Sequence, residues 1–130
     1  MLNNEVLNID LIQGYKEKLS SAILTKMITL YADQSQRYIS DIESALLISA
    51  NRIPATLPEV EEEHVEHYDA WKTACHKMKG AAASVGLIAV YELSKKMELM
   101  EDNKDEKVAL FIRLKQNNKE GIEAFLQFNK

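Results

Sequence analysis

His76 and four residues at helical spacing around it form the clearest chemical constellation in the chain. Lys72 lies one turn before His76, Lys79 and Gly80 lie one turn after it, and Ala83 lies two turns after it. A neutral imidazole is nucleophilic, and the ordinary histidine pKa of about 6.5 leaves the ring mostly neutral near pH 7. A lysine ammonium group binds phosphate oxygens as a point charge. The spacing therefore predicts an exposed imidazole between two cations, an arrangement that would suit a phosphoryl acceptor.

Gly80 has an unfavourable residue type for the middle of a helix. Glycine costs about 1 kcal/mol there relative to alanine, so its presence calls for a reason. Next to His76, a residue without a side chain would leave room for a second active site to approach the ring. We interpret Gly80 as an access residue, with the small Ala83 extending the same surface.

The helix that carries His76 is predicted to run from Glu59 to Val85. Four acidic residues at its start would be stabilised by the positive end of the helix dipole, and Gly86 is well placed to end it. On a helical wheel the apolar residues share one side, and His76 projects from the opposite side. The predicted core face consists of Trp71, Ala74, Cys75, Met78, Ala81, Ala82 and Val85.

A short helix is predicted near the N-terminus, at about residues 10–19. Asp10 would be its N-cap, and Gln13 lies at the reciprocal capping-box position. Ser20 or Ser21 would then begin the next helix, because serine side chains cap helix N-termini well.

This next helix follows an apolar pattern to about Asn51, although two helices joined by a kink near Asp33–Ser35 would fit as well. A flexible loop is predicted at about residues 52–59, which include Pro54 and Pro58. The apolar positions of the long helix are Ile23, Met27, Leu30, Tyr31, Tyr38, Ile42, Ala45, Leu46 and Ser49.

Two more helices are predicted after Gly86, separated by a polar connection at residues 101–105. The first has one apolar stripe, and so does the second: Leu87, Val90, Leu93, Met97 and Met100, then Val108, Phe111, Ile112, Ile122, Phe125 and Leu126. Four long amphipathic segments with short links predict an all-α fold, an antiparallel four-helix bundle with an additional short N-terminal helix. We expect residues 1–130 to form a single domain.

Composition excludes several classes of protein. The net charge of −4 argues against a nucleic-acid binder. The single cysteine, Cys75, excludes an intramolecular disulfide and fits a reducing compartment. No apolar run approaches the ~20 residues of a membrane span, and the N-terminus lacks the features of a secretory signal. These features predict a cytoplasmic domain without membrane contact.

The string HKMKGAAASVGL, from His76 to Leu87, resembles the signature of histidine-containing phosphotransfer (HPt) domains, H-x-[apolar]-K-G-[small]-[small]-x-x-[apolar]-G. It is especially similar to the C-terminal HPt domains of hybrid sensor kinases of the anoxic-redox and trimethylamine-N-oxide types. The resemblance implies that His76 is phosphorylated, that Lys79 supports the phosphoryl group, that Gly80 gives access and that Gly86 is structural. The implied partners are receiver domains of a hybrid sensor kinase and of a response regulator.

The sequence departs from this family at Glu98. Similar domains often present a glutamine to the histidine at the matching position. Two arrangements are open: Glu98 accepts a hydrogen bond from the second ring nitrogen of His76, or it points to solvent, where Lys95 and Lys72 screen its charge.

The resemblance implies a phosphocarrier and not a kinase, because the chain has no glycine-rich nucleotide loop. It also lacks an obvious carboxylate cluster for Mg²⁺ near His76, so we expect no cofactor of its own and Mg²⁺ on the receiver. The sequence leaves open whether the chain acts alone or forms the cytoplasmic end of a membrane-anchored sensor kinase. We expect the isolated domain to be a monomer.

Two alternatives belong to other classes of function. A metal-binding bundle would use Glu63, His64 and His67, which lie within one turn, with Cys75 two turns further on. A non-catalytic helical adaptor would need no exposed imidazole between lysines. The arrangement around His76 therefore favours the phosphocarrier over both alternatives.

Overall fold

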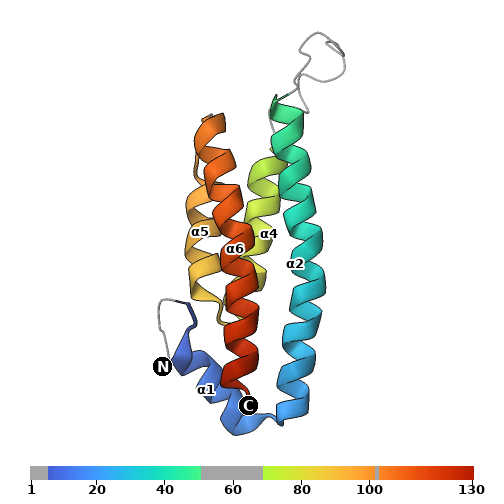
Figure 1. Cartoon of the computed structure of the whole chain (residues 1–130), viewed down its shortest axis with the longest axis vertical. Coiled ribbons are helices and arrows are strands. Elements are labelled where there is room, and N and C mark those ends of the chain that lie inside the picture. Colours follow the sequence, from blue (N-terminus) through green and yellow to red (C-terminus); the bar gives the residue numbers. More distant parts are fainter. Residues whose placement is uncertain (1–5, 51–68, 102) are drawn as a thin grey trace.

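The chain is helical along most of the sequence that the computed structural model describes, namely residues 6–50, 69–101 and 103–130. Four helices run alternately up and down beside one another, and a fifth crosses one end of them (Figure 1). The four are α2 (Ser21–Ala50), α4 (Ala70–Ser84), α5 (Ile88–Glu98) and α6 (Lys104–Phe128), and the crossing helix is α1 (Ile9–Lys18). The predicted all-α bundle with an extra N-terminal helix is confirmed.

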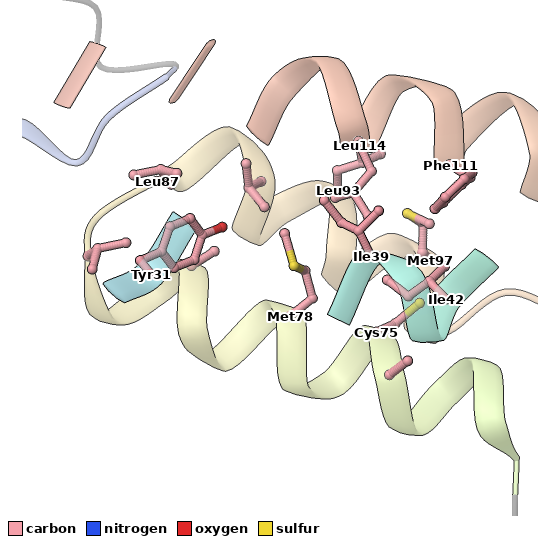
Figure 2. Close-up of a cluster of buried hydrophobic side chains, with 14 of the residues drawn as sticks. Tyr31, Ile39, Ile42, Cys75, Met78, Leu87, Leu93, Met97, Phe111 and Leu114 are labelled. Carbon is pink, nitrogen blue, oxygen red and sulfur yellow. The ribbon is translucent and has the colours of Figure 1, made fainter. Parts of the chain in front are cut away.

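The core lies between the four long helices. α4 packs on α2 and α5, and α6 closes the ring by packing on the same two helices. Side chains from all four meet in the interior, among them Ile42, Met78, Met97 and Leu114, all fully buried (Figure 2). Burial of such apolar surface is the main stabilising contribution to a fold of this kind. The core face predicted for α4 is confirmed, with only Ala81 partly rather than fully buried.

α2 is one uninterrupted helix, so the alternative with a kink near Asp33–Ser35 is wrong. The hydroxyl of Ser20 accepts a hydrogen bond from the backbone N–H of Ile23 at 3.1 Å, which confirms a serine cap. Ser35 does not break the helix, because its buried hydroxyl donates to the Ala32 carbonyl at 3.0 Å and accepts from the Asn118 amide at 2.9 Å. This buried polar residue in the middle of α2 therefore contributes to the packing of α2 against α6.

The cap of α1 is Asn8, and the prediction of Asp10 is wrong. The side chain of Asn8 accepts a hydrogen bond from the Leu11 backbone at 3.2 Å. Its own backbone N–H donates to the Gly86 carbonyl at 2.7 Å, a tertiary contact that fixes Asn8 at the capping position. Asp10 lies in the first turn instead, where its charge interacts favourably with the helix dipole.

The helix that carries His76 begins at Ala70, so a continuous helix from Glu59 is wrong at Asp69. The backbone of Asp69 is extended, and its carboxylate accepts a hydrogen bond from the Lys72 N–H at 3.0 Å. This is an N-cap, which starts a new helix. The predicted loop at residues 52–59 and the acidic helix start after it lie outside the described residues.

The apolar pattern of α6 predicted the buried face only in part. Phe111 and Phe125 are buried, but Val108, Ile112 and Leu126 are 37%, 58% and 39% exposed. The buried face includes polar and small residues instead, namely Lys107, Asn118 and Gly121. In α2, Ile23 and Leu30 are likewise exposed, contrary to the prediction. In α6, Asn118 can lie on the buried face because its amide oxygen accepts a hydrogen bond from the Tyr31 hydroxyl at 2.6 Å.

Gly86 ends α4 in the left-handed conformation, with φ of 76°. The N–H of Leu87 donates to the Ala82 carbonyl at 3.0 Å, and the N–H of Gly86 donates to the Ala83 carbonyl at 3.2 Å. This pair of bonds is the Schellman motif that commonly closes helices. The turn leads directly into α5, and so it sets how α5 lies against the histidine helix.

We predict that Gly86→Ala destabilises the protein. An added Cβ would lie 2.9 Å from Cγ1 of Ile12, and alanine in the left-handed region costs about 1–2 kcal/mol. We therefore expect the free energy of unfolding to fall by about 2 kcal/mol or more, as measured by urea denaturation with circular dichroism. Gly14→Ala is the control: a Cβ there meets nothing within 4 Å, so it should leave stability unchanged or raise it. Equal midpoints for both variants would contradict this account.

Candidate functional site

His76 lies midway along α4, on the side that faces away from the core. Its neighbours Cys75 and Met78 are fully buried and fix the rotation of the helix, so His76 must project outward. The His76 side chain is 66% exposed. Lys72, Gly80 and Ala83 are exposed on the same helix. The structure therefore places the predicted residues of α4 on its outer surface, with the imidazole accessible.

Glu98 reaches His76 from the last turn of α5. Oε2 of Glu98 lies 3.0 Å from Nδ1 of His76, and Oε1 lies 2.7 Å from Nζ of Lys79. One carboxylate thus bridges the imidazole and the lysine, and both lie on α4. Of the two arrangements that the sequence left open, the structure has the hydrogen bond to the second ring nitrogen.

A buried tryptophan holds the end of α5 in this position. The indole N–H of Trp71 donates to the carbonyl of Met97 at 2.7 Å, one residue before Glu98. Trp71 is itself 4% exposed, and the ammonium group of Lys107 lies 4.7 Å from the centre of its ring. The sequence pattern predicted Trp71 only as a residue of the core. Its polar contact with α5 depends on tertiary packing, for which no local pattern gives a signal.

The electrostatics of the cluster keep Glu98 ionised. The hydrogen bond from Lys79 is the main cause that lowers the pKa of the Glu98 carboxyl, and the hydrogen bond from His76 adds to it. An ionised carboxylate only accepts hydrogen bonds, so Nδ1 of His76 carries the proton that lies between them. In the neutral ring, the lone pair is then on Nε2. The atom of His76 that remains free to react is Nε2.

Gly80 has no packing role among the residues that the structure describes. A Cβ built at this position meets no atom within 4 Å, and the residue is exposed. Close packing against another helix of the described residues is therefore not the reason for this glycine. Gly80 leaves the helix surface one turn from His76 without a projecting side chain, and Ala83 adds only a methyl group further along α4.

Cys75 is unsuited to be a nucleophile or a surface metal ligand. Its side chain is fully buried, and this burial, together with the charge of Glu98, raises the pKa of the thiol to about 12. Within the described residues no three His, Cys, Asp or Glu side chains are grouped so as to hold a metal ion. Glu63, His64 and His67, which the metal alternative needs, lie outside those residues.

No helix in the described ranges is long and apolar enough to cross a membrane.

Searches of curated proteins and of solved structures give no significant match. A family model described as "Hpt domain" matches residues 26–125, which contain α4, α5 and all three residues of the His76–Lys79–Glu98 cluster. With most of its length matched and an exposed histidine midway along its bundle, the chain belongs to the family of Hpt domains, the histidine-containing phosphotransfer domains of His–Asp phosphorelays.

Proposed function

We propose that this protein carries a phosphoryl group on His76, which it accepts from a receiver-domain aspartate and passes to the aspartate of a response regulator. One observation carries the proposal: His76 is 66% exposed while its Nδ1 is bonded to Glu98, which leaves Nε2 accessible. An imidazole held in this way is a nucleophile that is already oriented before a partner docks.

In the proposed step the lone pair of Nε2 attacks the phosphorus of an aspartyl phosphate. The bond between phosphorus and the carboxylate oxygen breaks, and its electron pair returns to the aspartate. Lys79, whose ammonium group lies within the same cluster, supplies positive charge to the transferring phosphoryl oxygens. Gly80 leaves space for the receiver, and Lys72 adds positive charge to the face that the receiver approaches. Onward transfer is the same reaction in reverse.

The partner receivers are proposed to bring the Mg²⁺ that such transfers use. The protein needs no cofactor of its own in this scheme, because positioning and charge stabilisation are sufficient for a carrier. We further propose that residues 1–130 act as one monomeric domain in the cytoplasm. Its string from His76 to Leu87 supports kinship with the C-terminal domains of hybrid sensor kinases of the anoxic-redox and trimethylamine-N-oxide types.

Transfer from a receiver tests the proposal. Receiver domains of hybrid kinases and response regulators would be phosphorylated with labelled acetyl phosphate, purified and mixed with the protein. We expect label to move to this chain from at least one receiver, with loss of label from that receiver. A broad panel of receivers that all retain their label would overturn the proposal.

We predict that Lys79→Ala slows this transfer without unfolding the protein. Loss of one charged hydrogen-bond donor to a transferring group typically costs about 10- to 100-fold in rate. Lys77→Ala is the matched control, because Lys77 is also exposed on α4 but belongs to no contact of the His76–Lys79–Glu98 cluster. Initial transfer rates would be compared at equal receiver concentration. The same rate for both variants would remove Lys79 from the mechanism.

A further inference from the structure

Glu98 contacts both residues that the proposed transfer uses, and it stands where similar domains often have a glutamine. We propose that Glu98 is a positioning residue that shortens the lifetime of phosphorylated His76, because it keeps a proton on Nδ1 and competes with the phosphoryl group for Lys79. This inference rests on the proposed function and concerns how tightly the carrier keeps its phosphoryl group.

The geometry gives Glu98 a fixed position between its two partners. Its two oxygens bond separate groups, Nδ1 of His76 at 3.0 Å and Nζ of Lys79 at 2.7 Å. Its side chain is 21% exposed, and the bond from Trp71 to the Met97 carbonyl holds the backbone next to it. Lys72 of α4 and Lys95 of α5 are both exposed. Glu98 is thus an anion in direct contact with the reacting ring, with Oε2 at 3.0 Å from Nδ1.

The first effect of Glu98 is on the leaving group. After Nε2 of His76 bonds to phosphorus, a ring that keeps its Nδ1 proton is positively charged. When that N–P bond breaks, its electron pair returns to Nε2 and the ring leaves as neutral imidazole, while phosphorus bonds to an aspartate oxygen or to water. A ring without the Nδ1 proton would have to leave as an anion, which is far less favourable. Oε2 of Glu98, 3.0 Å from Nδ1, accepts a hydrogen bond from this proton and so favours the ring that leaves as neutral imidazole.

The second effect is on Lys79. Its ammonium group is already paired with Oε1 of Glu98, so a phosphoryl group on His76 has to share this cation with the carboxylate. Two anions that share one cation repel each other, which destabilises the phosphorylated state. A glutamine at this position would keep a hydrogen-bond acceptor of the same shape but would remove the charge. Both effects therefore predict a shorter lifetime with glutamate than with glutamine.

The lifetime test needs no partner protein. Wild type, Glu98→Gln and the control Glu92→Gln would be phosphorylated with phosphoramidate, a small phosphoryl donor, with His76→Ala as the blank. Glu92 is exposed on the same helix, so its replacement removes an equal charge away from the cluster. We expect the half-life of the phosphoryl group to rise about fivefold or more in Glu98→Gln, which is about 1 kcal/mol of activation free energy. The half-life in Glu92→Gln should equal that of wild type.

Nitrogen NMR of the His76 ring adds a readout that a purely structural role would not change. At a pH where the ring is neutral, the wild type should hold the proton on Nδ1. In Glu98→Gln the amide both accepts and donates, so the population should shift towards the form with the proton on Nε2. Circular dichroism would confirm that the variant is folded.

The inference is supported if the lifetime and the proton position both change in Glu98→Gln alone. It is overturned if either stays at the wild-type value. Failure of the proposed function looks different, because phosphoramidate would then label wild-type His76 normally while no receiver exchanged phosphoryl groups with it.

Discussion

Replacement of His76 by alanine is expected to abolish phosphoryl acceptance from a receiver and to leave the helical bundle intact. The ring is the only nucleophile of the described site that faces solvent, since Cys75 is fully buried with its thiol pKa raised to about 12. Its removal should lower the rate by at least about 1,000-fold, as loss of a nucleophile usually does. The stability change should stay within about 0.5 kcal/mol, because the His76 side chain is 66% exposed and lies outside the core.

The measurement is label transfer from a phosphorylated receiver, together with thermal unfolding of the same samples. His76→Gln is the matched variant, because it keeps a polar side chain of similar reach but has no nucleophilic ring nitrogen. Both variants should take no label and should unfold at nearly the wild-type temperature. Label on a folded variant would assign acceptance to another residue, and His64 and His67 would be the first to test.

Gly80→Gln is expected to block transfer between proteins while leaving the chemistry of His76 intact. A Cβ at this position meets nothing within 4 Å, so glutamine fits the folded chain and projects into the space that a receiver would occupy. We expect transfer from a receiver to fall by at least about 10-fold, the consequence of about 1.4 kcal/mol of steric cost in docking. Stability should rise by up to about 1 kcal/mol, because glycine is unfavourable within a helix.

Two donors separate docking from chemistry in this variant. Phosphoramidate is small and needs no docking surface, so it should label Gly80→Gln at nearly the wild-type rate. A receiver should label Gly80→Gln slowly. The rate of labelling of Gly80→Ala by a receiver should lie between those of wild type and Gly80→Gln. A wild-type rate from the receiver would refute the access role of Gly80. Equal loss with both donors would mean that the substitution damages the site itself.

Much of the fold could be predicted because apolar periodicity marks the buried faces of α4 and α5. The predicted positions of these two helices are buried, except that Ala81 and Met100 are partly buried. The phase of α6 could not be predicted in full, because its buried face includes Asn118, which is bonded to Tyr31 and Ser35 of α2. In the sequence, a polar residue that is paired inside a core cannot be told from a polar surface residue. Only its hydrogen-bond partners, which are distant in the sequence, distinguish the two.

The start of α4 shows a second limit of local patterns. Asp69 follows a stretch rich in helix-forming residues, and aspartate suits both a first turn and an N-cap. Only the observed backbone conformation decides between these roles. The same ambiguity led to Asp10 rather than Asn8 as the predicted cap of α1, where the contact of Asn8 with Gly86 is the deciding interaction.

For the site as well, the sequence could predict the residues on one helix but not the contact between two helices. Lys79 and Gly80 follow His76 on one helix, so their placement near the ring came directly from spacing. Glu98 lies 22 residues away on another helix, and its bridge to His76 and Lys79 depends on how α5 packs on α4. The bond from Trp71 to the end of α5 contributes to that packing. The sequence identified Glu98 as a departure from the family, but tertiary structure was needed to place its carboxylate.

Mapping the phosphoryl group on the chain after transfer from a receiver tests most directly whether His76 carries it. The phosphorylated protein would be digested at alkaline pH and analysed by tandem mass spectrometry, with parallel samples treated with acid. We expect one phosphoryl group, on His76, that is lost in acid and retained in alkali, as for an N–P bond. A phosphoryl group at any other residue, or one that survives acid, would contradict the account.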